Sequence, residues 1–179
     1  LPSGNEVLNI RELSFAYPSA KEVLSKVSFG VRREDKLFIV GANGSGKSTL
    51  LEAVAAAYGF NPEGGTRNYR FSTYDSHSEL YQAVRLIRSP RRPAWGYYLR
   101  AESFYNVATH IDEMDEQPAG SPHVIEGYGG VSLHKQSHGE SFLSVIRDFR
   151  GKGLYILDEP EAALSPMRLL TLMVEMDTL

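Results

Sequence analysis

A glycine-rich segment around residue 45 carries the residue types that bind phosphate. It reads Gly41-Ala-Asn-Gly-Ser-Gly-Lys-Ser-Thr49 and fits the pattern G-x-x-x-x-G-K-[ST] in full. Glycines let backbone N–H groups turn toward phosphate oxygens, the lysine supplies a cation, and the serine hydroxyl can ligate Mg²⁺. A chance glycine-rich turn is the alternative, which the strand and helix signals on either side disfavour. We therefore predict a nucleotide phosphate site formed by Asn43, Gly44, Ser45, Gly46, Lys47, Ser48 and Thr49.

Two adjacent carboxylates, Asp158 and Glu159, follow the apolar run Leu154–Leu157. A buried strand that ends in this way brings its carboxylates to the carboxyl edge of a sheet, where α/β proteins bind ligands. Asp158 can hold Mg²⁺ there, and Glu159 can orient and deprotonate a water. The alternative is that Asp-Glu-Pro simply opens a helix. The phosphate loop upstream favours the catalytic interpretation, with Glu159 and Lys47 as catalytic residues.

The elements around these motifs indicate an α/β fold of the P-loop NTPase type. The run Leu37–Val40 predicts a strand buried on both faces, and residues 48–58 predict a helix that stops at Gly59. The segments Val7–Tyr17 and Val23–Arg32 predict an antiparallel flank at the N-terminus. We expect a mostly parallel central sheet with helices on both faces, in one domain over residues 1–179.

Further along the chain, periodicity and turn residues predict the remaining elements. A capping box predicts a helix from His77 to Arg88, and Trp95–Leu99 resembles a strand. Asp112–Pro122 is acidic and contains proline, which is typical of a surface loop. Helices are expected over Gly139–Arg150 and Pro166–Asp177. Residues 75–150 would then form a helical region inserted between the phosphate loop and the acidic strand.

Composition excludes several classes of protein. The chain has 179 residues, 42% of them hydrophobic and 23% charged, a net charge of −3, and no cysteine. Disordered proteins, disulfide scaffolds, thiol nucleophiles and Cys-based metal sites are therefore excluded. No secretory leader or membrane-length apolar run occurs, so we expect a cytoplasmic protein without direct membrane insertion.

Three segments taken together resemble the motifs of the ABC-type ATPase family. They are GANGSGKST at Gly41–Thr49, SHGES at Ser137–Ser141, and LYILDEPEAALSP at Leu154–Pro166. The resemblance implies ATP and Mg²⁺ as cofactors and a nucleotide-dependent homodimer that pairs head to tail. It implies that one copy caps the γ-phosphate held by the other, through Ser137, Gly139 and Glu140. It also implies that Tyr17 stacks on adenine and that Glu102 takes the place of a family glutamine near the metal.

The sequence departs from the family pattern at several points. The segment Ser137–Ser141 corresponds to the family's signature motif, in which His138 and Glu140 here replace a glycine and a glutamine. These replacements make the motif resemble that of predicted soluble bacterial ATPases near the DNA-repair branch of the family. Residues 5–50 are instead similar to ABC domains of the transporter or translation-factor type, and either an engineered origin or mosaic drift accounts for the difference. All five histidines precede Asp158, so the family's switch histidine has no counterpart. We expect a truncated core that lacks the C-terminal strands and hydrolyses ATP slowly.

Three functions follow as hypotheses. The first is an Mg-dependent ATPase that dimerises to do mechanical work; the others are a nucleotide-gated binding module with little turnover and the ATP-binding subunit of a transporter. The basic residues Arg85, Arg88, Arg91, Arg92 and Arg100 lie near Trp95, Tyr97 and Tyr98 in sequence. They fit a nucleic-acid surface. A solvated helix end beside a core strand is the interpretation that the negative net charge favours.

Overall fold

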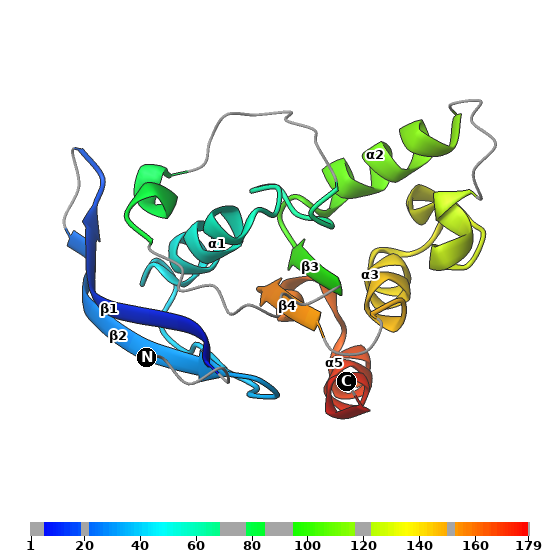
Figure 1. Cartoon of the computed structure of the whole chain (residues 1–179). Coiled ribbons are helices and arrows are strands. Elements are labelled where there is room, and N and C mark those ends of the chain that lie inside the picture. The colour runs from blue at the N-terminus through cyan, green and yellow to red at the C-terminus, as the bar shows by residue number, and fades with distance from the viewer. Residues whose placement is uncertain are drawn as a thin grey trace.

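The fold is described from a computed structural model of the chain (Figure 1). The structure describes residues 6–18, 22–68, 78–84, 95–116, 123–149 and 153–178. Two pairs of strands and five α-helices organise these residues. No helix among them combines the length and the apolar character that a membrane span requires.

An antiparallel pair forms the N-terminal flank, as the sequence predicts. Strands β1 (Glu6–Ala16) and β2 (Glu22–Arg32) pair from Glu6 opposite Arg32 to Ala16 opposite Glu22, with several register irregularities. Ile10, Leu13 and Leu24 are buried on one face of the pair, and the register irregularity between Ile10 and Leu13 brings these two residues to the same face although they are three apart. This face covers helix α1 (Lys47–Tyr58).

A second, parallel pair lies at the centre of the molecule. Strands β3 (Trp95–Arg100) and β4 (Gly153–Asp158) run in register, with Arg100 opposite Asp158 at their carboxyl ends. Alternate side chains point to opposite faces, so Tyr98 and Ile156 join the core around α1. Tyr97 and Leu99 join a second core on the other face. Figure 1 shows α1 and α3 on opposite sides of this pair.

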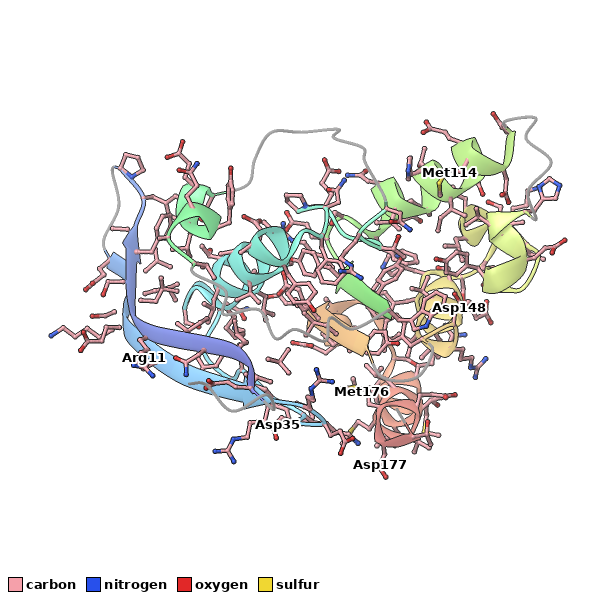
Figure 2. All side chains as sticks on the ribbon, in the orientation of Figure 1. Arg11, Asp35, Met114, Asp148, Met176 and Asp177 are labelled. Carbon is pink, nitrogen blue, oxygen red and sulfur yellow. The ribbon has the colours of Figure 1, made fainter. Side chains whose placement is uncertain are left out.

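The remaining helices build the second core. They are α2 (Phe104–Glu116), α3 (His138–Arg147), the short α4 (Pro160–Ala163) and α5 (Pro166–Thr178), with 3-10 turns at Val124–Tyr128 and Leu133–Lys135. Their apolar faces meet around Phe142, Ile111 and Leu172, which are all fully buried. A further 3-10 turn, Glu79–Gln82, packs instead into the core around α1 through Leu80. Figure 2 places Asp35, in the turn after β2, beside Asp177 of α5. There the neighbouring Lys36 forms an ion pair with Asp177 at 3.1 Å.

Helices cover both faces of the central strands, because α1 packs on one face of β3–β4 and α3 packs on the other.

The prediction of a buried strand at Leu37–Val40 is wrong. The segment has no regular structure, and most of it is open to solvent, with Phe38 68% and Val40 91% exposed, while Ile39 is half-buried against the core around α1. A fully buried parallel strand needs a hydrogen-bonded neighbour on each side. Among the described residues β4 pairs only with β3, so no ladder reaches this segment. Where the sequence predicts a mostly parallel central sheet, the described residues form a parallel sheet of two strands, β3 and β4.

Two helix boundaries also differ from prediction. Of the helix expected from His77 to Arg88, the described residues show only the 3-10 turn Glu79–Gln82, which ends at Ala83. His77 and residues 85–88 lie outside the described residues. The acidic segment predicted as a loop is helical up to Glu116, because α2 carries an apolar stripe at Phe104, Val107, Ala108 and Ile111. Asp112 and Asp115 of this segment accept hydrogen bonds from Ser132, Val124 and Ile125, which ties α2 to the following turns. Residues 117–122 are not described.

Candidate functional site

The phosphate loop is a tight turn that leads directly into α1. Gly44 and Gly46 have φ angles of 77° and 84°, in the left-handed region that glycine adopts at little cost. A Cβ on Gly46 would also lie 2.6 Å from Val23 Cγ1, so β2 packs against the loop backbone. The Lys47 ammonium donates to the carbonyls of Gly41 at 2.8 Å and Ala42 at 3.0 Å. The Lys47 ammonium thus lies over the phosphate loop, where a bound phosphate would also lie.

Helix α1 points its N-terminus at this loop. The first backbone N–H groups of a helix lack intrahelical partners and carry partial positive charge. Together with the loop N–H groups they suit an anion such as a triphosphate. Asn43, Gly44 and Ser45 form the rim of the loop, where Ser45 N–H donates to the Ala42 carbonyl at 3.2 Å.

The two magnesium-ligand candidates from distant parts of the chain meet at this point. Ser48 Oγ donates to Asp158 Oδ1 at 2.9 Å, although 110 residues separate them. Asp158 is only 3% exposed, and this burial raises the pKa of its carboxyl. The Ser48 hydroxyl and the Arg100 guanidinium act against the rise by stabilising the ionised form. A hydroxyl and a carboxylate side by side are oxygen ligands of the kind that Mg²⁺ prefers.

Glu159 follows Asp158 and is exposed at the carboxyl end of β4. It has a φ of 50° and a ψ of 48°, a left-handed conformation that is uncommon outside glycine, and it caps α4 with Pro160 at the first helical position. The conformation turns the chain sharply away from the strand. Glu159 thus directly follows Asp158 at the end of β4, and its role as the base stays a prediction.

A buried ion network lies behind Asp158, and Arg100 is its centre. The guanidinium contacts Glu52 at 2.9 Å and Glu102 at 3.0 Å, and its Nε lies 3.5 Å from Asp158 Oδ2. Glu52 also accepts the backbone N–H of Ser78 at 2.9 Å. This role of Arg100 and Glu52 could not be predicted from the sequence, because it depends on the pairing of β3 with β4 and on the packing of α1.

The third predicted metal ligand, Glu102, contacts Arg100, which also contacts Asp158. The Glu102 side chain is 81% exposed. Within the described ranges, no group of three or more His, Asp or Glu side chains could hold a metal ion by itself. Glu102 as a metal ligand stays a prediction, whereas Ser48 and Asp158 are already in contact.

Tyr17, the predicted adenine contact, lies just after β1 and 42% of it is exposed. Its hydroxyl is 3.3 Å from Thr49 Oγ1, on the first turn of α1. Phe15 supports the ring edge-on, with 4.9 Å between centroids. The aromatic face is thus held beside the phosphate loop, at a place that suits stacking on a base.

The predicted signature residues lie on the other side of the central strands (Figure 1). Ser137 precedes α3 as its N-cap, and Ser137 N–H and Oγ–H both donate to the Glu140 carboxylate, at 3.2 and 2.6 Å. Gly139 lies within the first turn and is buried. Because α1 and α3 pack against opposite faces of β3–β4, one chain does not bring the signature to its own phosphate loop.

Of the basic and aromatic patch, the structure describes Trp95, Tyr97, Tyr98 and Arg100. Tyr97 and Tyr98 are 4% and 0% exposed, so their rings are not available for stacking on bases. Arg100 is engaged in the ion network. The other four arginines of the patch lie outside the described residues. Trp95, by contrast, is 57% exposed. Nucleic-acid binding by this patch stays a prediction.

Comparison with known proteins assigns the family. The model of the family described as "ABC transporter" matches residues 24–144. The energy-coupling factor transporter ATP-binding protein EcfA1 of Fusobacterium nucleatum is 29% identical over 189 residues, covering 96% of this chain and 69% of that protein. EcfA of Methanothermobacter thermautotrophicus is 26% identical over 173 residues, covering 89% of this chain and 55% of that protein.

Other relatives match over shorter stretches. The lactococcin transport/processing ATP-binding protein LcnC-like of Lactococcus lactis is 41% identical over 59 residues, which are 33% of this chain and 8% of that protein. The chain thus spans roughly a tenth of several of its relatives. No solved structure matches it. The relatives described here give no support to the DNA-repair-like branch. Because the family model covers more than half of the chain, and the phosphate loop is in place, the chain belongs to the ABC transporter family.

Proposed function

We propose that the chain is the ATP-binding subunit of an ABC transporter of the energy-coupling-factor kind. It would bind ATP with Mg²⁺ and work on the cytoplasmic side of a membrane component. The observation that carries the proposal is the contact of Ser48 with Asp158 at 2.9 Å beneath the phosphate loop. Similarity to EcfA1 over 96% of the chain supports the transporter part.

Different residues bind the phosphates, the metal ion, the attacking water and the adenine base of ATP. The loop N–H groups and the α1 N-terminus bind the phosphates, and Lys47 exchanges its two carbonyl contacts for the β- and γ-phosphate oxygens. Ser48 and Asp158 would hold Mg²⁺, which when bound neutralises charge on the same phosphates. Glu159 orients and deprotonates the attacking water. Tyr17 stacks on the base.

The active unit is a pair of copies arranged head to tail. The signature segment at the α3 N-terminus lies across the central strands from the phosphate loop of its own chain. It therefore serves a nucleotide held by the partner copy. Ser137 offers a hydroxyl, and the helix N-terminus offers backbone N–H groups, to the terminal phosphate.

Steady-state phosphate release tests the ATPase. The wild-type rate should rise faster than linearly with protein concentration in the dimerising range. Glu159→Gln should remove turnover while ATP stays bound, because a positioned base typically contributes about 10²–10⁴-fold. Lys47→Ala is the matched comparison: it should remove binding of a non-hydrolysable analogue itself, because a charge-assisted contact to the β- and γ-phosphates is lost.

Three outcomes would contradict the proposal. Turnover that scales linearly with concentration and survives Glu159→Gln would refute both the base and the dimer. Unchanged nucleotide affinity in Lys47→Ala would refute the phosphate site. For the transporter part, reconstitution in vesicles with the cognate membrane component should raise the rate, and an unchanged rate would contradict it.

A further inference from the structure

An arginine from α5 lies across the signature segment. Arg168 Nη2 donates to Glu140 Oε1 at 3.0 Å, and its Nη1 donates to Ser137 Oγ at 3.2 Å. Ser137 Oγ in turn donates to the other oxygen of Glu140 at 2.6 Å. One guanidinium thus contacts both side chains that close the N-terminus of α3.

The backbone of the signature is shaped to admit this arginine. A Cβ on Gly139 would lie 2.6 Å from Arg168 Nη1 and 3.1 Å from its Cδ. Glycine at this position therefore lets the side chain lie flat on the first turn of α3. The Ala163 carbonyl would be 3.3 Å from the same Cβ, so the end of α4 approaches there too.

The charges explain why such a contact is needed. Glu140 stays ionised, because the Ser137 hydroxyl, the Ser137 N–H and Arg168 all lower the pKa of its carboxyl. An uncompensated carboxylate at a helix N-terminus competes for the N–H groups that a phosphate would use, and it repels the phosphate. Arg168 brings the opposite charge to the same spot in a fixed fork geometry.

Resting on the proposed head-to-tail dimer, we propose that Arg168 is a positioning residue that neutralises Glu140 and holds the Ser137 hydroxyl in place, so that the signature can accept the terminal phosphate of ATP bound by the partner copy. Arg168 follows Asp158 and Glu159 by about one helix. The contacts of Arg168 with Ser137 and Glu140 therefore connect the signature to the chain segment that follows Glu159.

A charge-reversal experiment separates this role from simple packing. Nucleotide-dependent dimerisation is measured by sedimentation with Mg²⁺ and a non-hydrolysable ATP analogue, and nucleotide binding by the monomer is measured in the same samples at low protein concentration. Arg168→Ala should weaken dimerisation roughly tenfold or more and leave monomer binding unchanged, because an exposed charge is left facing the incoming phosphate. Adding Glu140→Gln should restore most of the loss, since the amide carries no charge.

Arg147 provides the matched control. It joins the same two helices through an ion pair with Glu175 at 3.5 Å and does not touch the signature. Arg147→Ala should leave dimerisation unchanged.

The outcomes distinguish this inference from the proposed function. A wild-type chain that stays monomeric with the analogue refutes the dimer, and the role of Arg168 falls with it. A wild-type chain that dimerises, with Arg168→Ala dimerising equally well, refutes only the role of Arg168. A defect in Arg168→Ala that Glu140→Gln fails to restore, or one that Arg147→Ala reproduces, shows a packing role and overturns the charge argument.

Discussion

Replacing Arg100 by methionine should destabilise the fold and spare most of its packing. Arg100 is the cation between Glu52 and Asp158, whose side chains are 9% and 3% exposed. Methionine has a similar length but no charge, so two buried carboxylates lose their shared partner. Glu102 is 81% exposed and loses little, because water solvates it.

The size of the effect follows from the burial of the partners. Removing one member of a buried ion pair typically costs about 3–5 kcal/mol of unfolding free energy, because the other charge is left uncompensated. A loss of about 3 kcal/mol corresponds to a fall in melting temperature of roughly 6–12 °C for a chain of this length. An additional Glu52→Gln change should recover part of the loss, since it removes one of the two buried charges.

The same variant has a defined pH dependence. Burial already raises the pKa of Asp158, and Arg100 acts against that rise. In Arg100→Met the folded-state pKa of Asp158 rises further, so the penalty is present above that pKa and disappears as pH falls through it. The destabilisation relative to wild type should therefore shrink toward acid pH.

Thermal and urea unfolding at neutral and acid pH measure this prediction. Arg147→Met is the control, because its partner Glu175 is exposed on the surface and the pair should contribute less than about 1 kcal/mol. Equal losses for Arg100→Met and Arg147→Met would refute the buried network. So would a loss for Arg100→Met that is independent of pH.

Two further predictions concern the nucleotide site. Gly46→Ala should lower the free energy of unfolding by more than the roughly 1–2 kcal/mol that a left-handed alanine costs, because its Cβ would also lie 2.6 Å from a β2 side chain. Gly44 also has a positive φ but open space around it, so Gly44→Ala should show the conformational cost alone. Urea unfolding measures both variants. Tyr17→Ala should weaken ATP binding by about 1 kcal/mol, or roughly fivefold, and leave pyrophosphate binding unchanged in calorimetry. Equal losses for ATP and pyrophosphate would show that Tyr17 acts only through Thr49.

Local signals predict the elements that carry the motifs. The phosphate loop leads into a helix that stops at Gly59, as its left-handed C-cap requires. The run Leu154–Leu157 is a strand that delivers Asp158, and the signature opens a helix. These features depend on residues close together in sequence, where glycine conformations and caps decide the structure.

Long-range pairing accounts for what the sequence did not predict. Leu37–Val40 has the composition of a buried strand, yet composition does not say whether a neighbouring strand is present to pair with it. Arg100 and Arg168 have their roles only because the fold brings Glu52 and Glu140 to them, 48 and 28 residues away. Such contacts lie beyond any local pattern.

The division of the apolar side chains into two cores affects how the molecule opens. Tyr98 and Ile156 belong to one core, while Tyr97 and Leu99 belong to the other. Either half can lose its protection against hydrogen exchange while the other stays folded. The Ser48–Asp158 hydrogen bond is a link between α1 and the strand shared by both cores. A ligand bound there stabilises both halves together and makes their unfolding more cooperative.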